Sequence, residues 1–177
     1  MAPAQISLWV VLGVALLISL TTDLLQRRIL DVVTYPMMAV ALGVRFAAEG
    51  VGGAEAGLVS GLLGALLGLF PFALFAWRGA VGWGDAKLMT AVGAVFGYPL
   101  IMAALVFVTL VGALQAVVAL IWHGEFWDTL SLGARRWAAK VGRKPAPEVP
   151  PARRIPYGIA IALGSFWAMW WDRSGTM

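Results

Sequence analysis

The sequence predicts an all-α fold, a polytopic membrane bundle of about six transmembrane helices that forms a single domain over residues 1–177. Composition is the first observation, because 61% of the residues are hydrophobic and 12% are charged, against about 45–50% and about 25% in soluble domains. The second is that apolar residues gather in stretches approaching the roughly 20 residues that a helix needs to cross a bilayer. The third is that Lys and Arg collect in alternate connections, as an oriented membrane protein requires.

The predicted helices correspond to six apolar stretches: 4–22, 33–48, 55–77, 86–98, 99–122 and 155–171. No Lys or Arg precedes the first stretch, and the pair Arg27-Arg28 follows it. A secretory signal has the opposite order of charge and apolar run. We therefore expect the first stretch to be an anchor that the mature protein keeps.

Small residues mark the third and fourth stretches. Glycines recur there every three or four residues, a spacing that favours close helix packing in a membrane: Gly57, Gly61, Gly64, Gly68, Gly93 and Gly97. The fourth stretch is short for a span, and only the turn-forming segment 97–99 separates it from the fifth. Five helices and a re-entrant segment are therefore an alternative.

The longest polar segment, at about 123–154, is expected to be a cytoplasmic loop. At helical spacing its first part places apolar side chains on one face, with the basic ones mostly off it: Trp127, Leu130, Ala134, Trp137, Ala138 and Val141. This pattern predicts a helix lying in the membrane interface, where Trp is favoured. A solvated loop is the alternative. The proline-rich segment 145–151 is expected to be an extended connector.

Counting basic residues in the connections orients the predicted bundle. With the N-terminus outside, eleven of the thirteen Lys and Arg residues lie on the cytoplasmic side, while Arg45 and Arg173 lie near the outer face. Because basic connections stay in the cytoplasm, this orientation is strongly favoured. It brings Asp23, which follows the first stretch, to the same cytoplasmic boundary as Asp85, which precedes the fourth.

These two aspartates are the candidate catalytic residues. Ionised carboxylates at membrane depth are costly unless they are paired or hydrated. Two that share one site hold a single proton near neutral pH, because repulsion raises the proton affinity of one of them. The ionised member can then deprotonate a water that attacks a peptide carbonyl, while the protonated member hydrogen-bonds the developing oxyanion. Gly82 and Gly84 lie just before Asp85 and would allow a substrate backbone to come close.

Each acidic residue also has a structural interpretation. Asp23 alone fits a residue that marks a helix end at the membrane boundary. Asp31 is expected to be the N-cap of the second helix, with its carboxylate accepting hydrogen bonds from the backbone of Val33 or Thr34. Asp85 is likewise a candidate N-cap, for a helix that begins at Ala86.

Composition argues against several other chemistries. The chain has no cysteine, so it has no thiolate nucleophile, disulfide or Cys-type zinc site. His123 is the sole histidine, which makes zinc hydrolysis poorly supported. We expect no metal and no cofactor. The net charge of +4 is typical of basic cytoplasmic connections, and we expect no nucleic-acid partner.

Three motifs resemble those of the type IV prepilin peptidases, which are GxGD membrane aspartyl proteases. Residues 82–88, Gly-Trp-Gly-Asp-Ala-Lys-Leu, resemble the GxGD-x-KL signature. Residues 23–31 resemble the first aspartate motif, although Leu30 and Asp31 stand where that family usually has Pro and Asn. Residues 156–158 resemble the closing Pro-Tyr-Gly segment. The three motifs occur in the family's order and span most of the chain.

The resemblance implies that the catalytic pair is Asp23 and Asp85. The residues that it implies in support of this pair are Gly82, Gly84, Lys87, Pro156, Tyr157 and Gly158. It further implies a multi-pass enzyme of the bacterial inner membrane that cuts the basic leader from prepilins after a glycine, on the cytoplasmic side. The expected partners are therefore a prepilin substrate and the lipid bilayer.

The chain resembles the short forms that serve tight-adherence, or Flp-type, pili. It lacks the insertion and the cysteines that larger members use for a methyltransferase region, so N-methylation is not expected. Presenilin-type proteases share GxGD, but they carry their first aspartate late in a longer bundle and have a Pro-Ala-Leu motif that this chain lacks.

Two functions from other classes remain open. A small transporter or proton channel would also use paired carboxylates, but it should show polar residues in the middle of several helices, and the six stretches contain few. A non-catalytic assembly subunit would tolerate loss of either aspartate. Two interpretations of Lys87 also stand side by side, since it either steadies the ionised pair or lies at the membrane interface.

Overall fold

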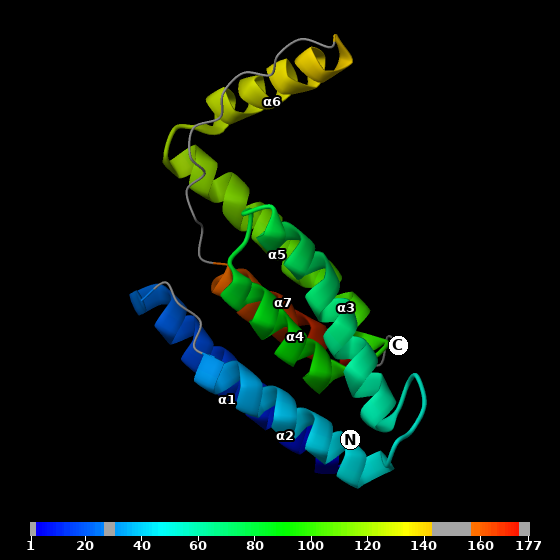
Figure 1. Cartoon of the computed structure of the whole chain (residues 1–177). Coiled ribbons are helices and arrows are strands. Elements are labelled where there is room, and N and C mark those ends of the chain that lie inside the picture. The colour runs from blue at the N-terminus through cyan, green and yellow to red at the C-terminus, as the bar shows by residue number, and fades with distance from the viewer. Residues whose placement is uncertain (1–2, 27–30, 143–156, 174–177) are drawn as a thin grey trace.

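The computed structural model describes residues 3–26, 31–142 and 157–173, and these ranges contain helices and no strand (Figure 1). The predicted all-α fold is confirmed, and so is the order of its segments. The helices are α1 (Pro3–Gln26), α2 (Asp31–Glu49), α3 (Gly57–Trp77), α4 (Trp83–Phe96), α5 (Leu100–Trp122), α6 (Phe126–Val141) and α7 (Gly158–Arg173).

Four of these helices, α1, α2, α3 and α5, are long and apolar enough to cross a membrane. They turn large apolar side chains outward, as a lipid-embedded bundle does, for example Leu17, Phe70 and Leu114, which are 65%, 74% and 64% exposed. Helices α4 and α7 are shorter, with 14 and 16 residues. At 1.5 Å per residue α4 is about 21 Å long, less than the roughly 30 Å of bilayer hydrocarbon.

The short helix α4 lies at the centre of the bundle. It contacts α1, α2, α3, α5 and α7, and the side chains of Leu88, Met89 and Val92 are completely buried. A helix surrounded in this way satisfies its apolar surface against protein and needs little lipid contact. Because α4 carries the GxGD segment at its first turn, its neighbours determine where Asp85 lies.

Glycines set the close contact between α3 and α4, as the sequence predicts. A methyl group at Gly64 would collide with the backbone oxygen of Gly93, and a methyl group at Gly68 would collide with that of Met89. The two backbones therefore approach where other residues would separate them. Gly57 differs from this pattern, because it begins α3 with φ of 67° and packs on Gly50. Its role is in the turn between α2 and α3.

Arg45 holds the opposite end of α4. Its guanidinium donates to three backbone oxygens at that end, those of Ala94 at 3.1 Å, Val95 at 2.8 Å and Phe96 at 2.6 Å. The last carbonyls of a helix have no partner within the helix, so this one side chain from α2 supplies the missing donors. Gly97, with φ of 67°, then ends the helix.

Candidate active site

Asp23 lies in the last two turns of α1 and is buried, with 5% of its surface exposed. Its Oδ2 atom accepts a hydrogen bond of 3.0 Å from the backbone N–H of Gly158, the first residue of α7. The two residues are 135 positions apart in the sequence. The bond therefore joins the first aspartate motif to the Pro-Tyr-Gly segment.

Gly158 is a position where the site requires glycine. A Cβ atom there would lie 2.5 Å from Oδ2 of Asp23 and 3.1 Å from its Cγ, which is closer than van der Waals contact allows. The missing side chain lets the carboxylate reach the backbone N–H. Glycine at position 158 therefore brings a backbone donor to the first of the two aspartates.

Asp85 is the third residue of α4 and is 8% exposed. Its Oδ2 atom accepts a hydrogen bond of 3.1 Å from the backbone N–H of Gly82, the N-cap residue. The interpretation of Asp85 as an N-cap is wrong, because the helix begins at Trp83 and not at Ala86. The carboxylate closes the first turn from inside the helix, as the N3 acid of a capping box does.

The two motif glycines occupy different places. Gly82 is exposed and Gly84 is half-buried in the first turn of α4. A Cβ atom at Gly82 would lie 3.0 Å from Oδ2 of Asp85, so glycine also relieves crowding at the second carboxylate. The site thus repeats one arrangement, in which a carboxylate oxygen meets the backbone N–H of a glycine.

The structure brings Asp23 and Asp85 together from α1 and α4. Asp85 precedes the predicted fourth span, 86–98, and lies outside the four helices that are long enough to cross a membrane. Burial, and next the negative charge of Asp23, raise the pKa of the Asp85 carboxyl to about 6, against a smaller opposing effect of the Gly82 hydrogen bond. Asp85 therefore takes up a proton at a higher pH than an ordinary aspartate does.

Tyr157 lies beside the pair, immediately before Gly158. It is half-buried, and its ring meets that of Phe72 edge-on with 6.0 Å between the ring centres. Burial, and next the negative charge of Asp85, raise the pKa of the Tyr157 phenol. Its hydroxyl packs against Gly112 of α5, where a Cβ atom would be 2.5 Å away. Tyr157 and Gly158 therefore each interact with one of the two carboxylates. Pro156, the remaining residue of this motif, lies outside the described residues.

Lys87 does not contact the pair and binds Asp31 instead. Its Nζ atom lies 2.8 Å from both carboxylate oxygens of Asp31 and 5.5 Å from the centre of the Tyr35 ring. Asp31 begins α2, and its carboxylate binds this lysine rather than the backbone amides expected of an N-cap. The side chains of Lys87 and Asp31 are 37% and 52% exposed, so their salt bridge links α2 and α4 at the surface.

Ser19 is a polar residue of this region that the sequence did not single out. It lies one turn before Asp23 on α1, is 1% exposed, and its hydroxyl has no hydrogen-bond partner among the described residues. Ser19 and Asp23 are four residues apart, a spacing that places two side chains on one face of a helix, and this spacing could have indicated Ser19 from the sequence. Within the described ranges, no three acidic or histidine side chains gather in a way that could hold a metal ion.

Comparison with known proteins gives one match. The model of the type IV leader peptidase family matches residues 10–117. The matched range contains Asp23, the GxGD segment and Asp85, and it ends before Tyr157 and Gly158. No curated protein and no solved structure matches the chain.

Proposed function

We propose that this chain, which belongs to the type IV leader peptidase family, is a membrane peptidase in which Asp23 and Asp85 activate water for peptide hydrolysis. One observation carries the proposal. Two buried carboxylates from α1 and α4 interact electrostatically at one end of the bundle, and each is held through Oδ2 by the backbone N–H of a glycine. Such a pair can act as base and acid together.

The different surroundings of the two carboxylates suggest a division of roles. Asp85, whose pKa is raised, is the member that holds the proton when the pair is singly protonated, so it acts as the acid and Asp23 acts as the base. Asp23 accepts a proton from water as the water oxygen attacks the peptide carbonyl carbon, and Asp85 donates its proton to the carbonyl oxygen. Collapse of the tetrahedral intermediate breaks the C–N bond. The proton held by Asp23 passes to the leaving nitrogen, and the hydroxyl proton returns to Asp85.

The proposed substrate is a prepilin, cut after a glycine between its basic leader and its apolar helix. The proposed site of action is the cytoplasmic face of the bacterial inner membrane, with the N-terminus of the enzyme outside. The excess of Lys and Arg on the side that carries both aspartates supports this orientation. The absence of cysteine supports a form without N-methyltransferase activity, of the kind that serves Flp-type pili.

Co-expression with a candidate prepilin tests the proposal. Asp23→Asn and Asp85→Asn should each reduce leader removal by about a thousandfold or more, since residues that act as a unit lose nearly all activity singly. Mass spectrometry of the pilin reads the result. Asp31→Asn is the matched control, because it changes an exposed carboxylate at the same end and should leave processing largely intact. Continued processing by either of the first two variants would refute the shared role.

A further inference from the structure

Helix α6 stands apart from the bundle. Among the described helices it contacts α5 alone, and it lies beyond the end of the bundle where α3 ends and α4 begins (Figure 1). Its 16 residues are thus positioned by one neighbour. No other helix that the structure describes covers it.

The apolar side chains of α6 lie on one face. Viewed down the helix axis, with about 100° between successive residues, five apolar side chains fall within an arc of about 100°. Phe126 and Trp127 mark the two edges of this arc, and Trp137, Leu130 and Val141 lie between them. Trp127 is 74% exposed and Trp137 is 72% exposed. Two tryptophans and a valine that the described bundle leaves exposed on one helix form an apolar surface that a partner is expected to cover.

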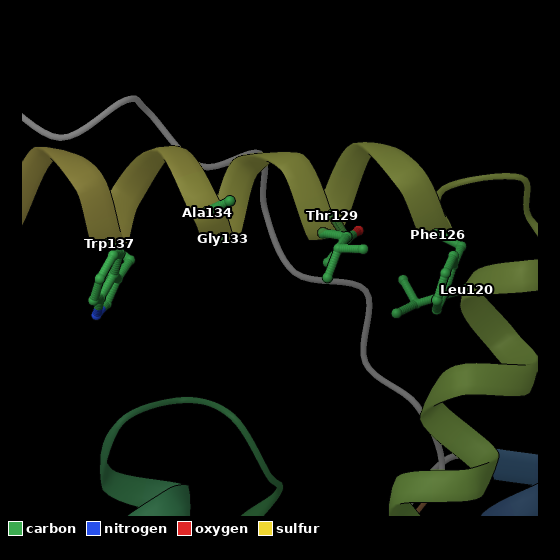
Figure 2. A pocket seen from close by; sticks show the side chains of 7 residues that line it. Leu120, Phe126, Thr129, Gly133, Ala134 and Trp137 are labelled. Carbon is green, nitrogen blue, oxygen red and sulfur yellow. The ribbon is translucent and has the colours of Figure 1, made fainter.

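Figure 2 shows which way this face is turned. The side chains of Phe126, Thr129 and Trp137 project from the side of α6 on which Leu120 and the end of α5 lie. Between them is a groove of about 470 Å³. The apolar face is therefore turned toward the level of the bundle, and not away from it.

Connectivity places α6 at the membrane surface. Helix α5, with 23 residues, is about 35 Å long and fits the bilayer hydrocarbon. It ends at Trp122, which is 85% exposed, and α6 begins four residues later at Phe126. A link of three residues spans at most about 11 Å, so the start of α6 cannot be far from the headgroups.

The basic residues of α6 and of the segment after it favour an anionic partner. Residues 135–144 contain five Lys and Arg residues, and Arg135 and Arg136 on α6 are exposed. Basic residues beside an apolar, Trp-containing face are typical of helices that bind anionic lipid headgroups. A basic leader, as in the proposed substrate, would be repelled by this segment.

We infer that α6 is a membrane-surface helix that binds the anionic lipid leaflet at the end of the bundle that carries Asp23 and Asp85. Its apolar face enters the boundary between headgroups and acyl chains, and Arg135 and Arg136 contact lipid phosphates. The partner is lipid rather than another protein. The inference concerns binding and does not depend on the proposed cleavage reaction.

The absence of cysteine allows a direct test with one probe at a time. Leu130→Cys and Leu132→Cys place the same fluorophore two residues apart on opposite faces of α6. The full chain is reconstituted in vesicles of phosphatidylcholine with increasing phosphatidylglycerol. The probe at 130 should shift its emission to the blue and be quenched by spin-labelled lipids, while the probe at 132 should stay aqueous.

Arg135→Gln combined with Arg136→Gln tests the headgroup contact in the same assay. Each arginine near an anionic surface contributes about fivefold in affinity, so the double variant should need much more phosphatidylglycerol for the same emission shift. Two outcomes overturn the inference. Both probes could remain aqueous at high phosphatidylglycerol, or the probe at 130 could be shielded without quenching by lipid, which would indicate a protein partner.

Discussion

The two ends of α4 carry side chains of opposite charge in different surroundings. At the end of the helix, the Arg45 guanidinium binds the backbone oxygens of Ala94, Val95 and Phe96. At the beginning, the Asp85 carboxylate has one backbone donor among the described residues, Gly82, and it faces the like charge of Asp23. Both charges suit the helix dipole, which favours anions at the N-terminus and cations at the C-terminus.

The difference distinguishes a structural charge from one available for chemistry. Arg45 satisfies three acceptors that would otherwise be unpaired, so its burial is compensated. Asp85 has fewer donors than an ionised carboxylate can use, and its neighbour opposes ionisation. The beginning of α4 therefore binds a proton more readily than an ordinary carboxylate does, in a place where a substrate could use it.

The largest effect is expected when the end of α4 loses its cation. Arg45→Met removes the donors for three backbone oxygens and should reduce stability by about 3–5 kcal/mol. Thermal unfolding in detergent micelles measures the change. Arg173→Met is the control at the same end of the bundle, since Arg173 stacks on the ring of Trp9 at 5.0 Å and should contribute less than about 1 kcal/mol. Equal losses for both variants would contradict the special place of Arg45.

The next effect concerns Asp23, the carboxylate that lies beside the beginning of α4. Gly158→Ala places a methyl group 2.5 Å from Oδ2 of Asp23 and must displace the carboxylate. A displacement of about 1 Å in an active site can cost about a hundredfold in rate. The measurement is the initial rate of leader removal in reconstituted vesicles.

Gly13→Ala is the matched control for this substitution. Gly13 lies on α1, the helix that carries Asp23, and a Cβ atom there meets nothing within 4 Å. Alanine should therefore leave the rate unchanged and stabilise the helix slightly. Wild-type activity in Gly158→Ala would show that the contact with Asp23 does not determine the position of the carboxylate.

The smallest effect is the dependence of stability on pH. The pKa of Asp85 in the folded protein, about 6, exceeds the ordinary aspartate value of 3.8, so the folded protein loses stability as pH rises from about 4 through about 6. Asp85→Asn cannot ionise and should be more stable than the wild type by about 2–3 kcal/mol at pH 7.5, because one pKa unit corresponds to about 1.4 kcal/mol. Below pH 4 the difference should vanish. Melting curves across this range decide the matter, and a gain that persists at low pH would have another cause.

Local patterns in the sequence were sufficient for much of the fold. Runs of apolar residues placed the helices, and the spacing of Gly64 and Gly68 indicated the close packing of α3 on α4. The amphipathic repeat located α6. Each of these signals lies within a few residues of the structure that it produces, because helix hydrogen bonds and helix faces repeat over three or four positions.

The start of α4 shows the limit of such signals. The sequence suggested a helix from Ala86 with Asp85 before it, whereas the helix begins at Trp83. Glycine is a weak helix former, so the segment 82–84 gave no helical signal. The hydrogen bond from Gly82 to Asp85 closes the turn, and this contact is specific to the folded chain.

The sequence by itself determined that this protein is a helical membrane bundle of the type IV leader peptidase family, since apolar content, basic connections and the GxGD segment are properties of the chain before it folds. Tertiary structure alone decided that the backbone of Gly158 meets Asp23, that Lys87 binds Asp31 and not the aspartate pair, and that Arg45 donates to the last backbone oxygens of α4. Each of these contacts joins residues at least 49 positions apart. No local periodicity encodes such distances, because only the packing of one helix on another brings the atoms together.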